Sequence, residues 1–482
     1  MTISQKRWAY SKQHRVTMAS LESYAQTADT VLLGSLDYKL PAGASYIIDR
    51  KSSQFFTSAA GSFGPDFVRS FRINLTSETG FCDLSTVSLS FRIKNTSPTA
   101  DNIADGGNVY RVYPKTGPWG FIYRLQVLAA GQPVSDILNY GRLHQMFHLL
   151  SPKDWKAQHV QDYTFGHDTD ASKDAKIGFI ENGDTVTVSM QIFEGIMQCA
   201  KAWPLRFAPL SVVVELAPST MCCQAWTLAN QTVKNNAGAD VANVRINAVR
   251  TYEIQDPKIH CDIITLDSGL TNAYAQLLLS GKALTLPINQ FITHNQAIAG
   301  RNPVVSITRA ASRLRQIFFS FQRKQDGDYL QRESEATDFS HPTRFMGRRP
   351  EAISDKLNFE TRWQLGPKLL PENPLRHVHE YYNHLLKAVG LLYDKEEPLD
   401  LTYKQYTTDR FIGAIDCERA LGVSWTGLNS RSGDLLTVQF QNLYQPAGVG
   451  TDVVDDPVSQ LHVVLVTEAV VEIRDTSVTV LD

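Results

Sequence analysis

The sequence has few cysteines and no long apolar run. Six cysteines in 482 residues are too few for a disulfide-stapled scaffold, and no two have the C-x-x-C spacing of a zinc site or redox dithiol. Buried thiols in a reducing compartment are therefore expected. No stretch of 18 apolar residues could span a membrane, and the first fifteen residues lack the apolar core of a signal peptide. We expect a soluble protein that is made inside a cell.

An excess of charge of one sign is also lacking. The chain has 47 Lys and Arg against 49 Asp and Glu, a formal net charge of −2, so it has no general attraction to nucleic acid or anionic membrane. Contact with DNA would need a local basic patch. One such patch lies in the N-terminal arm, before the first acidic residue, and consists of Lys6, Arg7, Lys12 and Arg15. The other interpretation of this arm is a flexible, solvated terminus.

Apolar and aromatic residues are plentiful. They make up 43% and 10% of the chain, which excludes wholesale disorder, and the length allows roughly two to four domains. Residues 86–95 (TVSLSFRIKN) alternate apolar and polar side chains, as a half-buried strand does. Many similar short runs occur, and the clearest helix-like patterns are 138–150, 270–279 and 377–389. Many short strands with few helices predict an all-β sandwich or barrel architecture.

One strand-turn-helix unit occurs twice. Residues 121–150 and 359–386 each run from a strand through a glycine and a proline-containing turn into a helix with His, an aromatic residue and Leu-Leu. The helix landmarks lie 13, 16 and 19 residues after the glycine in both units, a spacing that places them on one helix face. They are Gly131, His144, Phe147 and Leu150 in the first unit, and Gly366, His379, Tyr382 and Leu385 in the second. The repeat predicts two tandem β-sandwiches, although generic turn chemistry could also produce it by chance.

These patterns divide the chain. We predict an N-terminal arm over residues 1–36 and a first sandwich over 37–268. A connecting helix is expected at 269–281, ended by Gly281-Lys282. The second sandwich then runs over 282–482 and contains a long charged insertion at 324–357, of the length that is usually functional or disordered.

No pattern indicates catalysis. His144 and His148 have the i, i+4 spacing of zinc ligands, but Gln145 stands where the H-E-x-x-H motif has Glu, and no third ligand follows. Gly281-Lys282-Ala283 lacks the Ser or Thr and the earlier glycine of a phosphate-binding loop. There is no G-x-S-x-G motif, and the acidic residues are scattered. We expect neither an enzyme nor a cofactor or metal site, and interpret the histidines as packed or surface residues.

Several segments carry a family resemblance. They are TGPWGFIYRLQVLAAGQPVSDILNYGRLHQMFHLL (116–150), WPLRFAPLSVVVELAP (203–218), IITLDSGLTNAYAQLLLSGKALTLP (263–287), FETRWQLGPKLLPENPLRHVHEYYNHLL (359–386) and ERALGVSWTGLNSRSGDLLTVQFQNL (418–443). In their order, and with the internal duplication, they resemble the double jelly-roll major capsid proteins of double-stranded DNA viruses. That lineage includes adenovirus hexon, and the Polinton-like virus and virophage branch is the most similar.

The resemblance implies a fold and a role. The fold is two tandem eight-stranded jelly rolls with a few short helices. Three chains would form a pseudo-hexagonal capsomer, and capsomers would tile an icosahedral shell around a double-stranded DNA genome. The implied partners are the homotrimer itself, neighbouring capsomers, penton and minor capsid proteins, and packaged DNA at the basic arm. The implied location is the virion shell, assembled inside the host cell, with residues 151–183 and 324–357 as tower or rim insertions.

Two rival functions stay open at this stage. A carbohydrate-binding or adhesive β-sandwich protein would carry a signal peptide, surface aromatic platforms and disulfides. A β-sandwich glycoside hydrolase, which we favour less, would need two carboxylates about 5–10 Å apart in a groove. We expect Trp119, Trp203 and Trp425 to pack in a domain core or a subunit seam.

Overall fold

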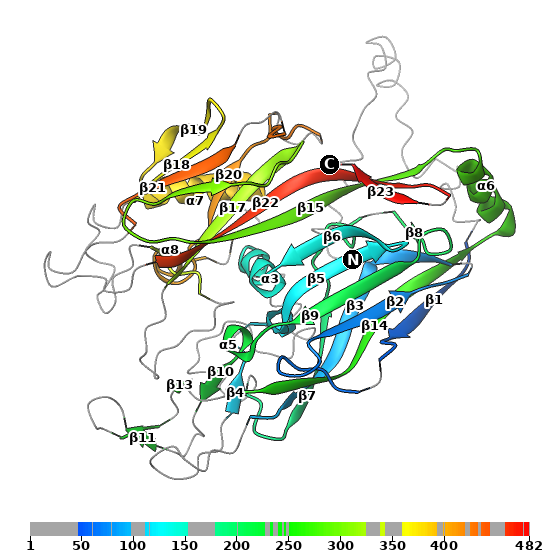
Figure 1. Cartoon of the computed structure of the whole chain (residues 1–482), viewed down its shortest axis with the longest axis horizontal. Coiled ribbons are helices and arrows are strands. Elements are labelled where there is room, and N and C mark those ends of the chain that lie inside the picture. The colour runs from blue at the N-terminus through cyan, green and yellow to red at the C-terminus, as the bar shows by residue number, and fades with distance from the viewer. Residues whose placement is uncertain are drawn as a thin grey trace, which may run out of the picture. The chain divides into compact units, whose positions relative to one another are not determined.

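Figure 1 shows a computed structural model of the chain. It describes residues 47–482 apart from 60, 79, 98–110, 115, 153–178, 200, 227–231, 235–239, 243–244, 247–249, 324–337, 343–358, 393–398, 400, 420–424, 432–434, 444–457, 476 and 482. The predicted arm contacts Lys6, Arg7, Lys12 and Arg15, and most of the insertion 324–357, lie outside these residues. Among the helices described, none is long and apolar enough to cross a membrane.

The strands up to residue 266 form two main sheets. One has the order β1 (Ile47–Phe56), β14 (Tyr252–Leu266), β3 (Gly80–Asn95), β7 (Thr185–Gln191), and β8 (Trp203–Pro204) also pairs with β3. The other has the order β2 (Ser70–Leu75), β9 (Leu210–Leu216), β5 (Ile122–Ala129), β6 (Gln132–Leu138). Short strands extend this half, namely β4 (Arg111–Tyr113), β10 (Gln224–Trp226), β11 (Thr232–Lys234), β12 (Asp240–Ala242) and β13 (Arg245–Ile246).

The strands from residue 284 onward form a second pair of sheets. One has the order β15 (Leu284–Ala297), β22 (Val458–Ile473), β17 (Leu314–Arg323), β20 (Gly413–Asp416), and β23 (Val478–Leu481) also pairs with β22. The other has the order β16 (Val304–Ile307), β21 (Leu436–Gln441), β18 (Glu360–Leu365), β19 (Lys368–Leu375). No described strand of one half pairs with a strand of the other.

The two halves have the same topology. If the eight main strands of each half are numbered along the chain, one sheet has the order 1-8-3-6 and the other 2-7-4-5, in both halves. The pairs within these sheets are antiparallel. This is the strand order of two jelly rolls, so the predicted all-β class and tandem sandwiches are confirmed. We call strands β1–β14 the first roll and β15–β23 the second roll.

Helices occupy the connections. They are the 3-10 helix η2 (Pro118–Phe121), α3 (Tyr140–Leu149), α5 (Ser219–Cys222), α6 (Ser268–Leu279), α7 (Val378–Val389) and α8 (Tyr403–Thr408). The link between the two rolls is α6, which Asp267 caps by accepting a hydrogen bond from the Gly269 amide. The helix that directly follows the fifth main strand is α3 in the first roll and α7 in the second. The exact domain limits given above stay a prediction.

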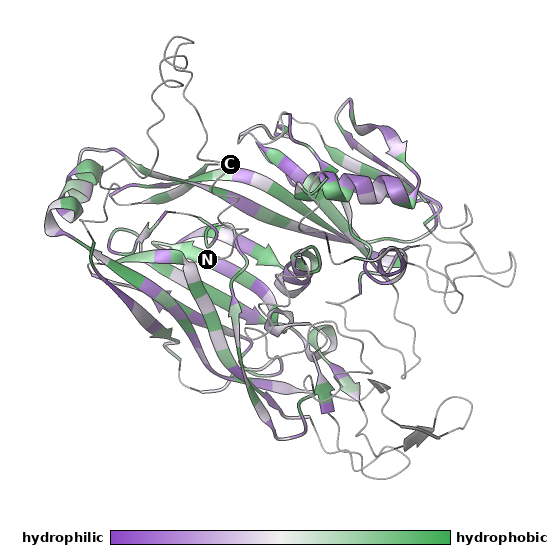
Figure 2. Ribbon diagram, turned by 180° about the vertical axis from the view of Figure 1, so that it is seen from behind, coloured by the Kyte–Doolittle hydropathy of each residue, from purple (hydrophilic) through white to green (hydrophobic). Residues whose placement is uncertain are grey.

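Alternating side chains explain why these segments form layered sheets. The ribbons of the long strands change between green and purple in Figure 2, because alternate residues face the core and the solvent. In β2 this alternation is strict: Phe71, Ile73 and Leu75 are buried, and the residues between them are exposed. The hydrophobic interior of each sandwich follows from this period of two.

Candidate assembly site

The helix that follows the fifth strand has a different environment in each roll. Nine of the ten residues of α3 are buried and the tenth, Phe147, is half-buried. In α7 only Val378, Tyr381, Leu385 and Ala388 are buried. A helix on the surface of one sandwich buries a single stripe, as α7 does. Since α3 is buried all round, a second body must cover it.

The landmark residues of the repeat lie in partly different surroundings. His144 is buried and stacks on Trp119, with ring centroids 4.3 Å apart and planes 3° apart, and burial lowers the pKa of His144 to about 3. His379 is exposed and stacks on Tyr403 at 5.8 Å. Phe147 and Tyr382 are both half-buried, and Leu150 and Leu385 are both buried. The role of these eight positions as repeat landmarks stays a prediction.

The landmark glycines both lie in two-residue hairpin turns. Gly131 has φ +82° and follows Ala130 at φ +48°, so both central residues are left-handed, as in a type I′ turn. Gly366 has φ +56° and is the first central residue, followed by Pro367, as in a type II′ turn. Both glycines therefore adopt the left-handed conformation that their turn requires, Gly131 at the second central position and Gly366 at the first.

Aromatic rings connect α3 to the second roll. The ring of Phe147 lies 5.4 Å from Phe291 on β15 and 5.2 Å from Phe318 on β17. Phe193, in the loop after β7, lies 4.8 Å from Phe147 and 5.1 Å from Phe291. Edge and offset contacts at these distances are favourable beyond the area they bury. This cluster covers the outer face of the β15–β22–β17 sheet.

Arg142 extends from α3 into the second roll. Its side chain donates hydrogen bonds of 3.1 Å to the Ser320 hydroxyl and to the Phe321 carbonyl, both on β17. The guanidinium lies 4.4 Å from the centre of the Phe339 ring, and the residue is buried. A buried guanidinium is costly unless it is hydrogen-bonded, so these contacts hold Arg142 in one position.

The loop of residues 192–202 closes over β15. A Cβ at Gly195 would lie 1.4 Å from the Asn289 carbonyl oxygen, so only glycine allows this approach. Lys201 donates a hydrogen bond of 3.0 Å to the Thr285 carbonyl. Beside the loop, Gln290 donates to the Val134 carbonyl of β6 at 3.3 Å. The first half of β15 is therefore in contact with the first roll.

Glu194 is enclosed in the same loop. Its exposed fraction is 0%, Oε2 accepts a hydrogen bond of 2.8 Å from the Ile196 amide, and Oε1 has no hydrogen-bond partner among the residues that the structure describes. Burial raises the pKa of Glu194 to about 7. Sequence reasoning missed both Glu194 and Arg142. The available signal was a charged residue inside an apolar run, IFEGIM for Glu194 and the helix pattern 138–150 for Arg142.

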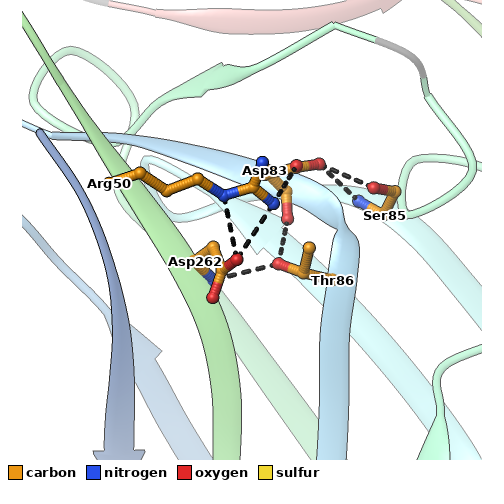
Figure 3. Close-up of polar contacts among 5 residues, drawn as sticks. All are labelled: Arg50, Asp83, Ser85, Thr86 and Asp262. Atoms are coloured by element: carbon orange, nitrogen blue, oxygen red, sulfur yellow. Dashed lines mark hydrogen bonds and ion pairs between the residues drawn. The ribbon is translucent and has the colours of Figure 1, made fainter. Parts of the chain in front are cut away.

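The strand of the first roll that corresponds to the covered strand β15 is β1, and most of its residues are exposed. β1 holds in its sheet the position that β15 holds in the second roll, and eight of its ten residues are exposed. In Figure 3 Arg50 of β1 bridges Asp262 of β14 and Asp83 of β3, with donor–acceptor distances of 2.9–3.0 Å. The clamp holds β1 to its sheet.

Large apolar side chains are exposed on β1 and in the loop between β20 and β21. Ile47 and Ile48 at the start of β1 are 43% and 67% exposed. Trp425 and Leu435, in the loop between β20 and β21, are 39% and 47% exposed. Of the three tryptophans expected to pack, Trp119 and Trp203 are fully buried, whereas Trp425 is exposed and stacks under Arg313.

Binding chemistry is sparse in the described part of the chain. No group of three or more His, Cys, Asp or Glu side chains there could hold a metal ion. His144 and His148 both contact the Trp119 ring, as packed histidines do. All six cysteines are free and buried, including the adjacent Cys222 and Cys223 with Sγ atoms 3.4 Å apart.

Comparison with known proteins yields only structural matches. No protein-family model and no curated protein sequence matches the chain. Among solved structures, VP54 of PBCV-1, fitted into a reconstruction of the virophage Sputnik, is 10% identical over 92% of this chain and 98% of its own, with a TM-score of 0.57. A Sputnik virophage structure is 10% identical over 93% and 92%, with a TM-score of 0.58. The Faustovirus major capsid protein is 9% identical over 94% of each chain, with a TM-score of 0.51.

These alignments span both rolls and most of each neighbour. The chain has the double jelly-roll fold. The double jelly roll predicted from the sequence segments is therefore confirmed at the level of fold. Within it, the contact of α3 and loop 192–202 with the second roll is the joint that makes the two rolls one body.

Proposed function

We propose that this protein is a structural major capsid protein. Three chains form a pseudo-hexagonal capsomer, and capsomers tile an icosahedral shell around a double-stranded DNA genome. The observation that carries the proposal is the same eight-strand order occurring twice in one chain, with the two rolls joined by the buried helix α3. Because each chain contains two similar rolls, three chains contribute six rolls to a tile with nearly six-fold symmetry. The structural neighbours named as capsid proteins support the same role.

The partners and location follow from this role. The protein associates with itself, with neighbouring capsomers, and with penton and minor capsid proteins, and it resides in the virion shell after assembly inside the host cell. The basic arm residues Lys6, Arg7, Lys12 and Arg15 contact packaged DNA or a neighbouring subunit. In the first roll, residues 151–183 lie between the fifth and the sixth main strand. In the second roll, residues 324–357 lie between the third and the fourth main strand. Long connections at such positions form the rim of the tile.

An enzymatic role has little support. The carboxylate with the clearest acid-like pKa, Glu194, is fully buried and cannot reach a sugar. Asp83 and Asp262 do lie near each other, but both accept hydrogen bonds from Arg50, so the space between the two carboxylates is taken by its guanidinium and not by a substrate. The carbohydrate-binding alternative would need an exposed aromatic platform. Trp425 is the most exposed tryptophan among the described residues, and Arg313 covers its ring at 4.5 Å.

Light scattering coupled to size-exclusion chromatography tests the proposal. The full chain at micromolar concentration is expected to elute as a trimer of about 161 kDa, three times the chain mass of 53.8 kDa. Negative-stain microscopy of the same fraction should show hexagonal tiles. A stable monomer under these conditions would contradict the proposed function, because obligate capsomers bury well over about 2,000 Å² per interface.

A further inference from the structure

We propose that protonation of Glu194 controls the closure of loop 192–202 over β15. With a proton on the carboxyl group the loop stays closed on the strand, and loss of that proton favours a state in which the loop has left the strand. The contact involved lies between the two rolls of one chain. The inference therefore goes beyond the proposed capsid function and does not depend on how many chains associate.

The Glu194 side chain is fully enclosed and only partly hydrogen-bonded. Its exposed fraction is 0%, and Oε2 accepts a hydrogen bond of 2.8 Å from the Ile196 amide. Among the described residues, Oε1 has no hydrogen-bond partner. An ionised carboxylate has about four lone-pair sites to satisfy, and burial of a charge with unfilled sites is costly. The closed loop therefore favours the protonated form.

No opposite charge compensates a negative charge on Glu194. Burial raises its pKa, and the Ser135 hydroxyl and the amides of residues 195–197 lower it, with no charged side chain among these groups. The charged and titratable residues of the loop, β6, β15 and α3 have other contacts. They are Lys201, which donates to the Thr285 carbonyl; Asp136, which pairs with Arg124; His294, which lies 3.4 Å from Gln296; Arg142, which donates to β17; and His144 and His148, which pack on Trp119.

The neighbours of Glu194 in the chain are the residues that contact β15. Gly195 approaches the strand so closely that a Cβ would lie 1.4 Å from the Asn289 carbonyl oxygen. On the other side, the Phe193 ring lies 5.1 Å from the ring of Phe291. A carboxylate that moves out to reach water has to move Phe193 and Gly195 with it. The charge on Glu194 therefore acts directly on the contact between the rolls.

Loop 192–202 is the part of this contact that can open by itself. Its described residues belong to no helix or strand, and the backbone hydrogen bonds within it are short-range, from Gln198 to Glu194 and from Cys199 to Ile196. By contrast, β15 pairs with β22 along all fourteen of its residues. Segments without a hydrogen-bonded ladder open at lower free energy than core strands. We therefore expect the loop to leave while β15 stays in its sheet.

The direction of the pH dependence follows from the two states of the loop. In the closed loop burial raises the pKa of Glu194 to about 7, and in the open loop the carboxyl group is in water and has its ordinary pKa of 4.5. The closed loop therefore binds the proton more tightly than the open loop. Closure is tightest below pH 4.5, weakens by about tenfold per pH unit up to pH 7, and changes little above it.

Hydrogen exchange of the full chain between pH 5 and pH 9 tests this inference. Protection factors, which divide out the intrinsic exchange rate at each pH, are compared for peptides from loop 192–202 and from β22. The loop should be less protected than β22 at every pH, and its protection should fall by roughly 70-fold between pH 5 and pH 8. Low concentrations of urea should not change it, since a local opening exposes little surface. Protection that is constant with pH, or equal in the loop and in β22, would overturn the inference.

Three variants separate the proton on Glu194 from other titrations. Glu194→Gln has no acid to ionise, so its loop protection should stay constant over this range. Glu372→Gln, exposed on β19, is the matched control and should follow wild type. Ser135→Ala removes a hydroxyl that lowers the Glu194 pKa, so its loop protection should go on falling above pH 7. This third profile can be read even if Glu194→Gln does not fold. A pH-dependent loop in Glu194→Gln, or a Ser135→Ala profile identical to wild type, would contradict the role of Glu194.

Discussion

Glu194 is an acid held where its charged form is unfavourable. It lies in the joint between the rolls, and its pKa is raised from the ordinary 4.5 to about 7 by burial. A raised acid pKa means that the folded state binds the proton more tightly than the unfolded state. The stability it contributes is complete below pH 4.5 and is lost as pH rises through 7.

Replacing Glu194 with glutamine should remove this pH dependence. For wild type, the difference between the two pKa values corresponds to about 3 kcal/mol of unfolding free energy lost between pH 4.5 and 8. Chemical denaturation at a series of pH values should show E194Q holding a nearly constant free energy across that window. The exposed Glu372→Gln is the control and should follow wild type. Parallel curves for wild type and E194Q would refute this role of Glu194.

His144 illustrates a titratable residue with no switching role. With its pKa lowered to about 3 by burial, it is neutral at pH 7, and its ring packs flat against Trp119. Its Nδ1 lies 3.2 Å from the Tyr140 hydroxyl, and that hydroxyl accepts a hydrogen bond from the Phe193 amide at 2.8 Å. The histidine therefore supports the loop that contacts the second roll.

Among the structural elements, the β5–β6 hairpin depends on one glycine. Gly131 is at φ +82°, a conformation that costs an L-residue roughly 1–2 kcal/mol, and a Cβ there would meet nothing within 4 Å. The cost of a substitution is therefore purely conformational. This matters for the joint because β6 contacts β15 through the hydrogen bond from Gln290 to Val134.

Gly131→Ala is expected to destabilise the protein by about 1–2 kcal/mol, measured as the free energy of unfolding in urea. Gly131→Asn is the matched variant, because asparagine tolerates the left-handed region, and it should lose clearly less. Equal losses in the two variants would show that something other than backbone conformation sets the cost.

At the level of the whole molecule, the two rolls share a joint built from buried side chains. Arg142, Phe147 and Phe193 of the first roll all contact β15 or β17 of the second. Bodies that share this much buried contact should unfold together, since exposing one exposes apolar surface on the other. A rigid joint of this kind suits a capsid tile, in which the two rolls of a chain must keep a fixed position relative to each other.

Arg142→Ala should uncouple the rolls. The change removes two hydrogen bonds from a buried guanidinium and leaves a void, an expected loss of about 2–4 kcal/mol. Scanning calorimetry is expected to show one transition for wild type and two separated transitions for the variant. The exposed Arg474→Ala is the control and should keep the wild-type profile. One unshifted transition in Arg142→Ala would show that Arg142 does not couple the rolls.

The sequence alone was sufficient for the architecture. Alternation in runs such as 86–95 predicted strands because side-chain period is a local property, and β3 contains that run. The repeated strand-turn-helix unit predicted two similar sandwiches, and α3 and α7 do hold the same place in both rolls. Local pattern could reveal these features since each is encoded within a few neighbouring residues.

Only the tertiary structure decided which parts of the two copies differ. Equal spacing in the sequence relates His144 to His379, yet His144 is buried among rings of the first roll, whereas His379 is exposed beside Tyr403. Arg142 meets Ser320 across 178 residues of sequence. Burial against so distant a segment leaves no mark in local periodicity, so the joint between the rolls emerges only when both have folded.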